Sequence, residues 1–434
     1  MSIERFNDNI RSAFGSLEQR INGAAGGPLH ALRRSALEAF TTQGVPTIRS
    51  EEWKYTNVLP LLAADLKQSS ESDLAAHDLA ELGRIPGVDA WRLVVVNGTV
   101  RSDVSTLPSD DAAVTVQIIT DELLASEPRV AAAFGHITPA SAHPFVAVNT
   151  ALAQYGVLVH VRGQLTRPLH VLCVGDARTS DILHTPRVLV LADTHAEATI
   201  IESHHTVGTY QSLDVTVVEV AAEAGSNVRY VKLLHDVNNA SHIGSTAAVV
   251  ARDARAICAT VITGGRFVRN DLHVRLVEPG ASGYLYGVSV LDGTSFADNH
   301  TVVDHVAPHC HSEELYKGVY DDKSIGVFNG KIFVREDAQK TTAYQSNHAL
   351  LLSQAAQINA KPQLEIWADD VKCSHGATTG QLNEDALFYL RARGLPEGDA
   401  RKLLTHAFAA EVMDHLDDDG IRTHMVALID EALA

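Results

Sequence analysis

The stretch SLDVTVVEVAAEAGSNVRYVKLL, residues 212–234, contains two β-strand patterns joined by a short polar turn. Residues 212–220 and 228–234 are rich in Val, Leu and Tyr, which favour strands. The turn between them carries Glu223 and Ala224 and leaves no room for a helix. The stretch therefore predicts consecutive strands without helical crossovers, which disfavours an α/β fold of alternating strands and helices.

Strand patterns continue through the middle of the chain, at residues 156–162, 169–174, 187–191, 256–262, 271–277, 283–291 and 324–334. Short polar turns containing alanine recur among them, at Ala198, Ala224, Ala254, Ala281 and Ala338. The spacings are 26, 30, 27 and 57 residues, the last close to two repeats. Periods of about 20–50 residues are typical of solenoids, and repeats of strands alone favour a β-helix. A β-sandwich is the alternative, because the period is irregular.

The two ends of the chain show helical or mixed patterns instead of consecutive strands. Residues 31–40 show the apolar spacing of a helix, and a strand pattern at 91–96 is followed by the tight-turn pair Asn97-Gly98. Near the C-terminus, helices are predicted from the Asn383 cap to residue 393, from Pro396 to about residue 415, and over 421–433. We therefore predict a mainly β protein with an N-terminal helical or mixed lobe at residues 1–150, a β-helix core at 151–378 and a C-terminal helical domain at 379–434.

Composition narrows the class of protein. The chain has 434 residues and a formal net charge of −18, which argues against a nucleic-acid partner because phosphate contacts need a basic surface. No apolar run approaches the roughly 20 residues of a membrane helix, and residues 1–20 do not resemble a signal peptide. The four cysteines are widely spaced, as in proteins that keep reduced thiols. We expect a cytoplasmic protein without a membrane partner.

Signatures of common enzymes are missing from the sequence. There is no GxxxxGK[ST] phosphate loop, no GxGxxG dinucleotide motif, no HExxH pair and no GxSxG nucleophile turn. A Cys-x-x-Cys pair is also missing, so a self-contained zinc or iron–sulfur site is not expected. The sequence favours a protein that is not an enzyme and that binds no cofactor stably on its own.

The segment KPQLEIWADDVKCSHGATTGQLNEDALF, residues 361–388, carries the strongest candidate site. Side chains two apart in a strand point the same way, so Cys373 and His375 are predicted to lie side by side on one face. A thiol beside an imidazole can bind a metal or activate a nucleophile. The alternative is a buried thiol beside a hydrogen-bonded imidazole.

The segment HVAPHCH, residues 305–311, is a second candidate for metal binding. His309 and His311 could share one face, with Cys310 opposite. No carboxylate accompanies them at ligand spacing until Glu313 and Glu314, so a polar edge or turn is the stronger interpretation.

Several motifs, taken in order, resemble a known family. They are EEWKYT at 51–56, DNHT at 298–301, SEELYKG at 312–318, VFNGK at 327–331, QSN at 345–347, LLLS at 350–353, KPQLEI at 361–366, ADDVKCSHGAT at 368–378 and FYLRARG at 388–394. Together they resemble the SufB/SufD family of the Suf iron–sulfur cluster assembly machinery. The likeness is dense from about residue 271 to 394 and thins through residues 60–200.

The resemblance implies a right-handed parallel β-helix between an N-terminal lobe and a C-terminal helical domain. It also implies a complex with the paralogous scaffold SufB and two copies of the ATPase SufC. In such complexes the β-helices pair edge to edge, the C-terminal helices hold one SufC, and ATP is bound by SufC. SufB has a cysteine where this chain reads Asn359-Ala360-Lys361-Pro362, and a Glu-His-Glu run near Cys373 and His375. These departures resemble the D-type subunit of the family, and whether it also forms a homodimer when isolated is left open.

The resemblance further implies a non-catalytic scaffold. In the family, the histidine that matches His375 is implicated in nascent cluster formation at the SufB–SufD interface, and Cys373 is the weaker carry-over. Iron or an iron–sulfur cluster would be shared transiently with SufB, with Asp369 and Asp370 as supporting groups. SufC dimerisation on ATP would shift this interface. Two alternatives are a purely structural adaptor and a β-helix enzyme acting on acidic polysaccharides, which the net charge of −18 opposes.

Overall fold

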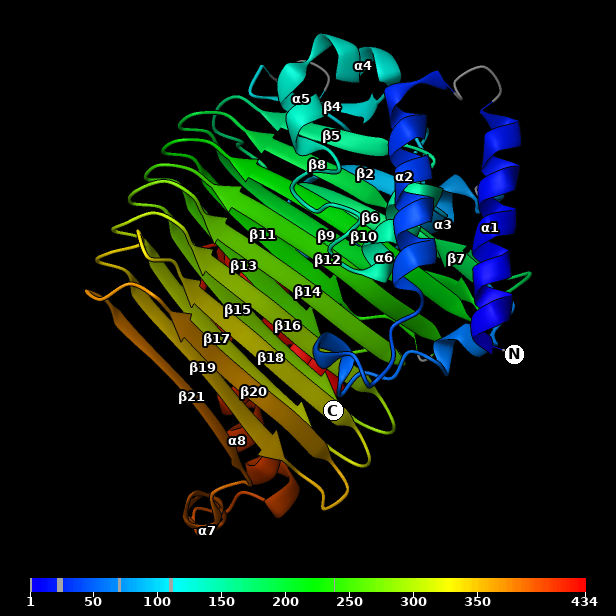
Figure 1. Cartoon of the computed structure of the whole chain (residues 1–434). Helices are drawn as coiled ribbons and strands as arrows, with labels where there is room; N and C mark the ends of the chain where they lie inside the picture. The colour runs from blue at the N-terminus through cyan, green and yellow to red at the C-terminus, as the bar shows by residue number, and fades with distance from the viewer. Residues whose placement is uncertain (1, 22–25, 69–71, 109–111, 238) are drawn as a thin grey trace.

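The chain coils through two mainly parallel β-sheets and forms a β-solenoid in the computed structural model (Figure 1), which describes residues 2–21, 26–68, 72–108, 112–237 and 239–434. The mainly β class and the β-helix are thereby confirmed, and the β-sandwich alternative is wrong. Sheet A contains β1 (Lys67–Gln68), β4 (Val114–Ile119), β5 (Gly156–Val161), β7 (Ile182–His184), β8 (Arg187–Ala192), β10 (Ser212–Ala222), β12 (Ala240–Val250), β14 (Phe267–Leu276), β16 (Phe296–His305), β18 (Ile325–Val334) and β20 (Gln357–Ile366). Sheet B contains β2 (Trp91–Val96), β3 (Thr99–Val100), β6 (Leu169–Ala177), β9 (Glu197–Gly208), β11 (Asn227–Leu234), β13 (Arg255–Ile262), β15 (Ser282–Leu291), β17 (His311–Tyr320), β19 (Thr342–Leu351) and β21 (Lys372–Gly380).

Each coil of the solenoid adds one strand to each sheet. Ser212 of β10 pairs with Ala240 of β12, and Asn227 of β11 pairs with Arg255 of β13, so both sheets advance by 28 residues at this point. This step agrees with the alanine spacing in the sequence. Alternate side chains of each strand face the interior between the two sheets, where Val220, Val250 and other apolar residues form the main core.

The recurring alanines have a structural cause. Ala196, Ala254, Ala281 and Ala338 are buried where the chain turns into the next strand of sheet B, and each backbone N–H donates to the carbonyl three residues earlier. Only a small side chain fits at this corner because the next coil stacks directly on it. In the first two coils the repeating position is Ala196 and Ser226, two residues away from the alanines that marked the period in the sequence.

The N-terminal region covers the outer face of sheet A, where α1, α2 and α6 pack against Leu213, Val215 and Ile243. This region also extends both sheets: β2 pairs with β6 and β4 pairs with β5. The predicted tight turn joins β2 to β3, with positive φ angles of 49° at Asn97 and 80° at Gly98. The N-terminal helices are α1 (Ser2–Arg20), α2 (Pro28–Gln43), η2 (Glu51–Trp53), η3 (Leu61–Ala63), α3 (Ala76–Glu81), α4 (Asp121–Ser126), α5 (Pro128–Ala133) and α6 (Pro144–Leu152).

Arg269 of β14 fastens the N-terminal segment to sheet A. Its buried guanidinium donates to the backbone carbonyl of Glu52 at 2.8 Å, to Asp298 at 2.9 Å and, through two nitrogens, to Asp271. The guanidinium carbon also lies 3.7 Å from the centre of the Trp53 ring. One cation thus joins residues from two strands to a segment more than 200 positions earlier in the chain.

The Glu52 side chain adds a second set of contacts to this junction. It accepts a 2.7 Å hydrogen bond from His300 and pairs with Lys331. The hydrogen bond from His300, supported by Lys331 and opposed by burial, lowers the pKa of Glu52 to about 2. Glu52 and Trp53 belong to the EEWKYT motif, so part of this motif acts as a structural anchor.

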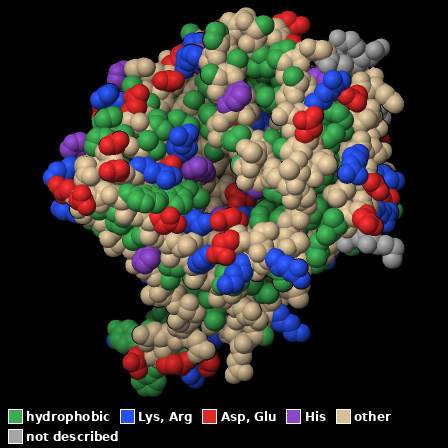
Figure 2. All heavy atoms as spheres, viewed as in Figure 1, with side chains coloured by type: hydrophobic (Ala, Val, Ile, Leu, Met, Phe, Trp, Pro, Cys, Tyr) green, Lys and Arg blue, Asp and Glu red, His purple; other side chains and the backbone are tan. Residues whose placement is uncertain are grey.

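The C-terminal helices cover the outer face of sheet B. Met413, Met425 and Ile429 pack against strand residues that include Val231 and Val288. Helix α7 projects beyond the end of the strands (Figures 1 and 2). The elements of this region are α7 (Glu384–Arg391), α8 (Glu397–Ala410), η4 (Glu411–His415) and α9 (Asp419–Ala432). No helix in the described part of the chain is both long and apolar enough to cross a membrane.

Candidate functional site

The last coil leaves both sheets with an open edge at the same end of the solenoid. Strand β20 pairs with β18 and ends sheet A, and β21 pairs with β19 and ends sheet B (Figure 1). Pro362 lies within β20, where it lacks a backbone N–H, as is typical of edge strands. Trp367, directly after β20, is 50% exposed. Two parallel edges with free backbone groups can be extended by strands of another chain.

The face of β21 that carries Cys373 and His375 continues the interior face of sheet B. His375 is in register with Gln345 of β19, which is in register with Glu314 of β17. We call Glu314, Gln345 and His375 the polar interior row. Glu314 and Gln345 are buried, whereas His375 is exposed because no further coil of this chain stacks on it. The row therefore leads from the core to the open edge.

Glu314 is a buried acid with no cationic partner among the described residues. Gln345 Nε2 donates to Glu314 Oε2, and burial raises the pKa of Glu314 to about 7. Within the described residues, Glu314 Oε1 and Gln345 Oε1 have no hydrogen-bond partner although both are buried. The row therefore joins a buried carboxyl group, whose neutral form is favoured by burial, to an exposed imidazole two coils away.

Cys373 lies in the neighbouring row, in register with Ala343 and Ser312. It is half-buried and packs against the main core. Burial raises the pKa of Cys373, so the thiol form is favoured in the isolated chain and an activated nucleophile is not supported. Its position suits a packed thiol, and it would become a ligand only if a metal or a partner displaced the proton.

Asp369 and Asp370 lie at the turn before β21 and are exposed. Asp370 pairs with Lys340 through its side chain, its carbonyl accepts from the Lys340 backbone N–H, and its own N–H donates to Gln339 Oε1. His375 is the fourth residue of the strand that follows, so the structure does not bring these acids to its imidazole. Asp370 instead holds the last turn against the coil below it.

The segment 305–311 does not gather into a metal site. His309 is in the turn with φ of 62°, Cys310 is buried and its thiol is 3.4 Å from the carbonyl of Glu278, and His311 packs beside Tyr284 outside sheet B. Burial raises the pKa of Cys310 to about 11. The polar-turn interpretation fits this segment, and Cys310 fills the small-residue corner before β17.

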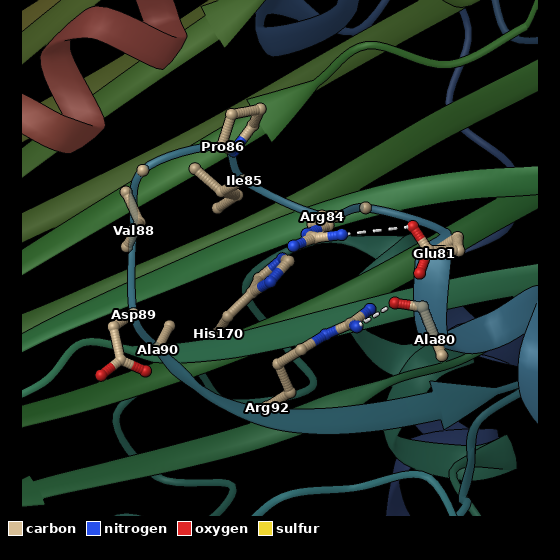
Figure 3. Close-up of a pocket in the computed structure, with 12 residues that line it drawn as sticks. Ala80, Glu81, Arg84, Ile85, Pro86, Val88, Asp89, Ala90, Arg92 and His170 are labelled. Carbon is tan, nitrogen blue, oxygen red and sulfur yellow. Dashed lines mark hydrogen bonds and ion pairs between the residues drawn. The ribbon is translucent and has the colours of Figure 1, made fainter.

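A surface pocket of 940 Å³ lies between the loop after α3 and sheet B (Figure 3). Arg92 borders it, but its guanidinium donates to the carbonyls of Leu79, Ala80 and Leu82 and so caps the end of α3. His170 is buried, contacts Ser203 Oγ at 2.7 Å, and has a pKa lowered to about 3 by burial. Both polar groups serve the fold, and the pocket has no catalytic arrangement among its described residues.

Sequence reasoning did not single out a buried group of charged side chains farther inside the solenoid. It includes Glu202 and His204 of β9, Asp214 of β10 and His242 of β12. The signal in the sequence was the alternation in Glu202-Ser203-His204, which puts an acid and an imidazole on one interior face.

The fold defines the class of protein as a parallel β-solenoid with helical regions on both outer faces and two open edges at one end. Two family models match it: the SufBD protein N-terminal region over residues 6–171, and the SufBD core domain of SUF system FeS cluster assembly over residues 175–408. The chain belongs to the SufBD family of iron–sulfur cluster assembly proteins.

Curated relatives agree with this family. An iron–sulfur cluster assembly SufBD family protein of Synechocystis is 31% identical over 396 residues, covering 88% of this chain and 86% of the relative. The iron–sulfur cluster assembly protein SufD of Escherichia coli is 29% identical over 403 residues, covering 92% and 91%. SufD of Bacillus subtilis is 26% identical over 296 residues, covering 66% of each chain.

Proposed function

We propose that this chain is the SufD-type scaffold of an iron–sulfur cluster assembly complex, with no catalytic centre of its own. It would pair with a SufB-type paralogue through β20 and β21 and bind a SufC-type ATPase through its C-terminal helices. The relatives named SufD support the subunit type, and the two open edges support pairing with a second solenoid. Nucleotide-driven movement of the ATPase would then shift the edge-to-edge interface.

The position of His375 is the observation that supports its proposed role in cluster formation. It is the exposed end of the polar interior row, on an edge strand that a partner would cover. A neutral imidazole nitrogen can coordinate iron, and a cysteine of the paralogue would supply a thiolate. Ligands divided between two chains leave the nascent cluster accessible for transfer, because movement of either chain opens the site.

Replacing His375 with alanine tests the ligand role. We expect the complex to assemble normally, because the side chain is exposed, and cluster formation to fall by at least about tenfold, as for the loss of a metal-site group. The measurement is cluster absorbance and iron content after reconstitution of the purified complex. Cys373→Ser in parallel is expected to have the smaller effect.

His348→Ala is the matched control, since His348 lies on the neighbouring strand β19 and faces away from the interior row. It should leave cluster formation unchanged. Normal cluster formation in the His375 variant, with an intact complex, would exclude the ligand role and favour the purely structural adaptor.

Helix α7 is the best-supported contact for the ATPase. Phe388 and Tyr389 are 72% and 55% exposed, and Phe388 borders a 550 Å³ pocket at the corner between α7 and α8. The projection shows apolar surface next to acidic side chains in Figure 2. Exposed aromatic residues beside a pocket are typical of protein interfaces.

The double change Phe388→Ala and Tyr389→Ala is expected to weaken ATPase binding by roughly 30-fold or more, the effect of losing an aromatic hot spot. The free energy of unfolding should change by less than about 0.5 kcal/mol, since both side chains are exposed. Calorimetric titration with the ATPase measures the first and urea unfolding the second. Tyr210→Ala is the control, because Tyr210 is an exposed aromatic residue between β9 and β10, outside the C-terminal helices. Unchanged affinity in the double variant would remove α7 from the interface.

Point changes are needed because α8, η4 and α9 cover sheet B. Deleting residues 384–434 would expose Val231, Val288 and the apolar residues around them, so lost binding could reflect a damaged fold.

A further inference from the structure

Three strands of sheet A place a His–Asp–His row on the interior face of the solenoid. Asp214 of β10 is in direct register with His184 of β7 on one side and with His242 of β12 on the other. His204 of β9 faces this row from sheet B. All four side chains are buried. Three imidazoles therefore surround one carboxylate, and they come from both sheets.

The Nδ1 atoms of the three imidazoles converge on the carboxylate of Asp214. His242 Nδ1 is 3.3 Å from Oδ2, His184 Nδ1 is 3.9 Å from Oδ1, and His204 Nδ1 contacts Oδ2. Potential ligand atoms of His204, Asp214 and His242 lie within 4.8 Å of one another, the only such group found among the described residues. A cavity of about 10 Å³ borders these three side chains, close to the space that one water or one ion needs.

Some of the imidazole nitrogens in this cluster lack hydrogen-bond partners. Within the described residues, His184 Nδ1, His204 Nδ1 and His242 Nε2 are buried without a hydrogen-bond partner of acceptable geometry. Buried imidazole nitrogens without partners are costly, and a metal ion at Asp214 would satisfy His184 Nδ1 and His204 Nδ1, whereas His242 Nε2 lies beside Gly244.

An outer contact orients the His204 imidazole as in known metal centres. The carboxylate of Glu202 lies 2.6 Å from His204 Nε2, so His204 could present Nδ1 to an ion while Nε2–H donates to Glu202. The His242 ring lies over Gly244, where an added Cβ would be 2.3 Å from His242 Nε2 and 3.0 Å from Lys232 Nζ. One carboxylate-supported imidazole, two further imidazoles and a facing aspartate are a donor set for a borderline divalent cation.

The alternative is a network of ion pairs without a metal. Lys232 lies 3.5 Å from Glu202, and a protonated His204 between Glu202 and Asp214 would balance the two carboxylates. Although burial opposes it, Asp214 and Glu202 raise the pKa of His204 to about 10. A divalent cation would replace the proton on His204 Nδ1, so the two states differ by one released proton and can be separated by measuring bound metal.

We infer that His184, His204, Asp214 and His242 form a structural site for Zn²⁺ or Fe²⁺ that joins the two sheets inside the solenoid. The site is closed by protein ligands, as structural metal sites are. It is separate from the open edge at His375 and does not depend on the proposed role in cluster assembly. Its purpose would be to hold β9 of sheet B against β10 and β12 of sheet A.

The full chain, produced without a histidine tag, is tested for bound metal by mass spectrometry after dialysis against a weak chelator. One sample is expressed and refolded with Zn²⁺ and another, without oxygen, with Fe²⁺, so that burial does not prevent loading. We expect one retained equivalent per chain and a higher thermal midpoint in the loaded sample, because a ligand of the native state stabilises it. The sample that keeps its metal identifies the ion.

Three substitutions separate this site from the other histidines of the chain. His242→Gln should remove the retained equivalent, and Glu202→Gln should weaken metal affinity by roughly 10–100-fold. His305→Gln is the matched control, because His305 is buried inside the solenoid and bonded to Ser312 rather than to an acid. It should keep the equivalent.

Anomalous scattering from crystals of the loaded parent protein provides a test that does not depend on variant folding. The expected result is a single peak among His184, His204, Asp214 and His242. No retained metal in either sample, a peak elsewhere, or an unchanged equivalent in His242→Gln would overturn the inference in favour of the ion-pair network.

Discussion

Replacing Arg269 with methionine is expected to lower the free energy of unfolding by about 3–5 kcal/mol, the cost of breaking a buried ion pair by removing one partner. Asp298 would remain buried without its cation, and the Glu52 carbonyl and the Trp53 ring would lose their contacts with the guanidinium. Methionine fills a similar volume, so the loss would be mainly electrostatic rather than a cavity effect.

Equilibrium urea unfolding measures this loss, and limited proteolysis of the N-terminal segment locates it. Arg275→Met is the matched control, because Arg275 lies on the same strand but is exposed. It should change stability by no more than about 0.5 kcal/mol. If both variants lose the same stability, Arg269 does not anchor the segment, and the EEWKYT motif needs another explanation.

Replacing Glu314 with glutamine is expected to stabilise the protein at pH 8 by up to about 3 kcal/mol. The pKa of Glu314 is about 7 in the folded protein, against 4.5 ordinarily, and one pKa unit corresponds to about 1.4 kcal/mol. Between these two values the folded state holds a proton that the unfolded state releases, so stability falls as pH rises from about 4.5 to 7 and then stays level. Glutamine cannot ionise and avoids this loss.

Urea unfolding of both proteins at several pH values tests the effect. The variant's advantage should be largest above pH 7 and should shrink toward zero below about pH 4.5, where the carboxyl is neutral in both states. Glu313→Gln, on the opposite face of the same strand, should show no such pH dependence. An advantage of equal size at all pH values would mean that burial of charge is not its cause.

Most of the strands that sequence patterns identified have largely apolar interior faces, although β10 also carries Asp214 on that face. Strands β9, β12, β16, β17 and β19 were not among them, because their interior positions carry polar residues such as His204 and Asn299. In a solenoid such residues can bond to the equivalent position of the next coil: Asn270 Nδ2 donates to Asn299 Oδ1 at 3.4 Å. The sequence of a single strand contains the polar residue but does not reveal the hydrogen-bond partner in the next coil that allows it to be buried.

The sequence likewise predicted only part of the candidate site. Sequence alternation correctly put Cys373 and His375 on one face of a strand. It could not show that this face continues through Gln345 to Glu314, nor that the segment 305–311 turns its side chains in different directions. Nor could it show that Arg269 meets Glu52 and Trp53.

By itself the sequence determined the strand-rich repeat, the helical ends and the pairing of Cys373 with His375, because these depend on spacing along a few residues. The tertiary structure alone decided which residues share the interior: Glu314, Gln345 and His375 are about 30 positions apart and become neighbours only when coils stack in register. The same stacking brings His184, Asp214 and His242 into one row. The physical reason is that hydrogen bonding between parallel strands sets this register, and no local spacing records it.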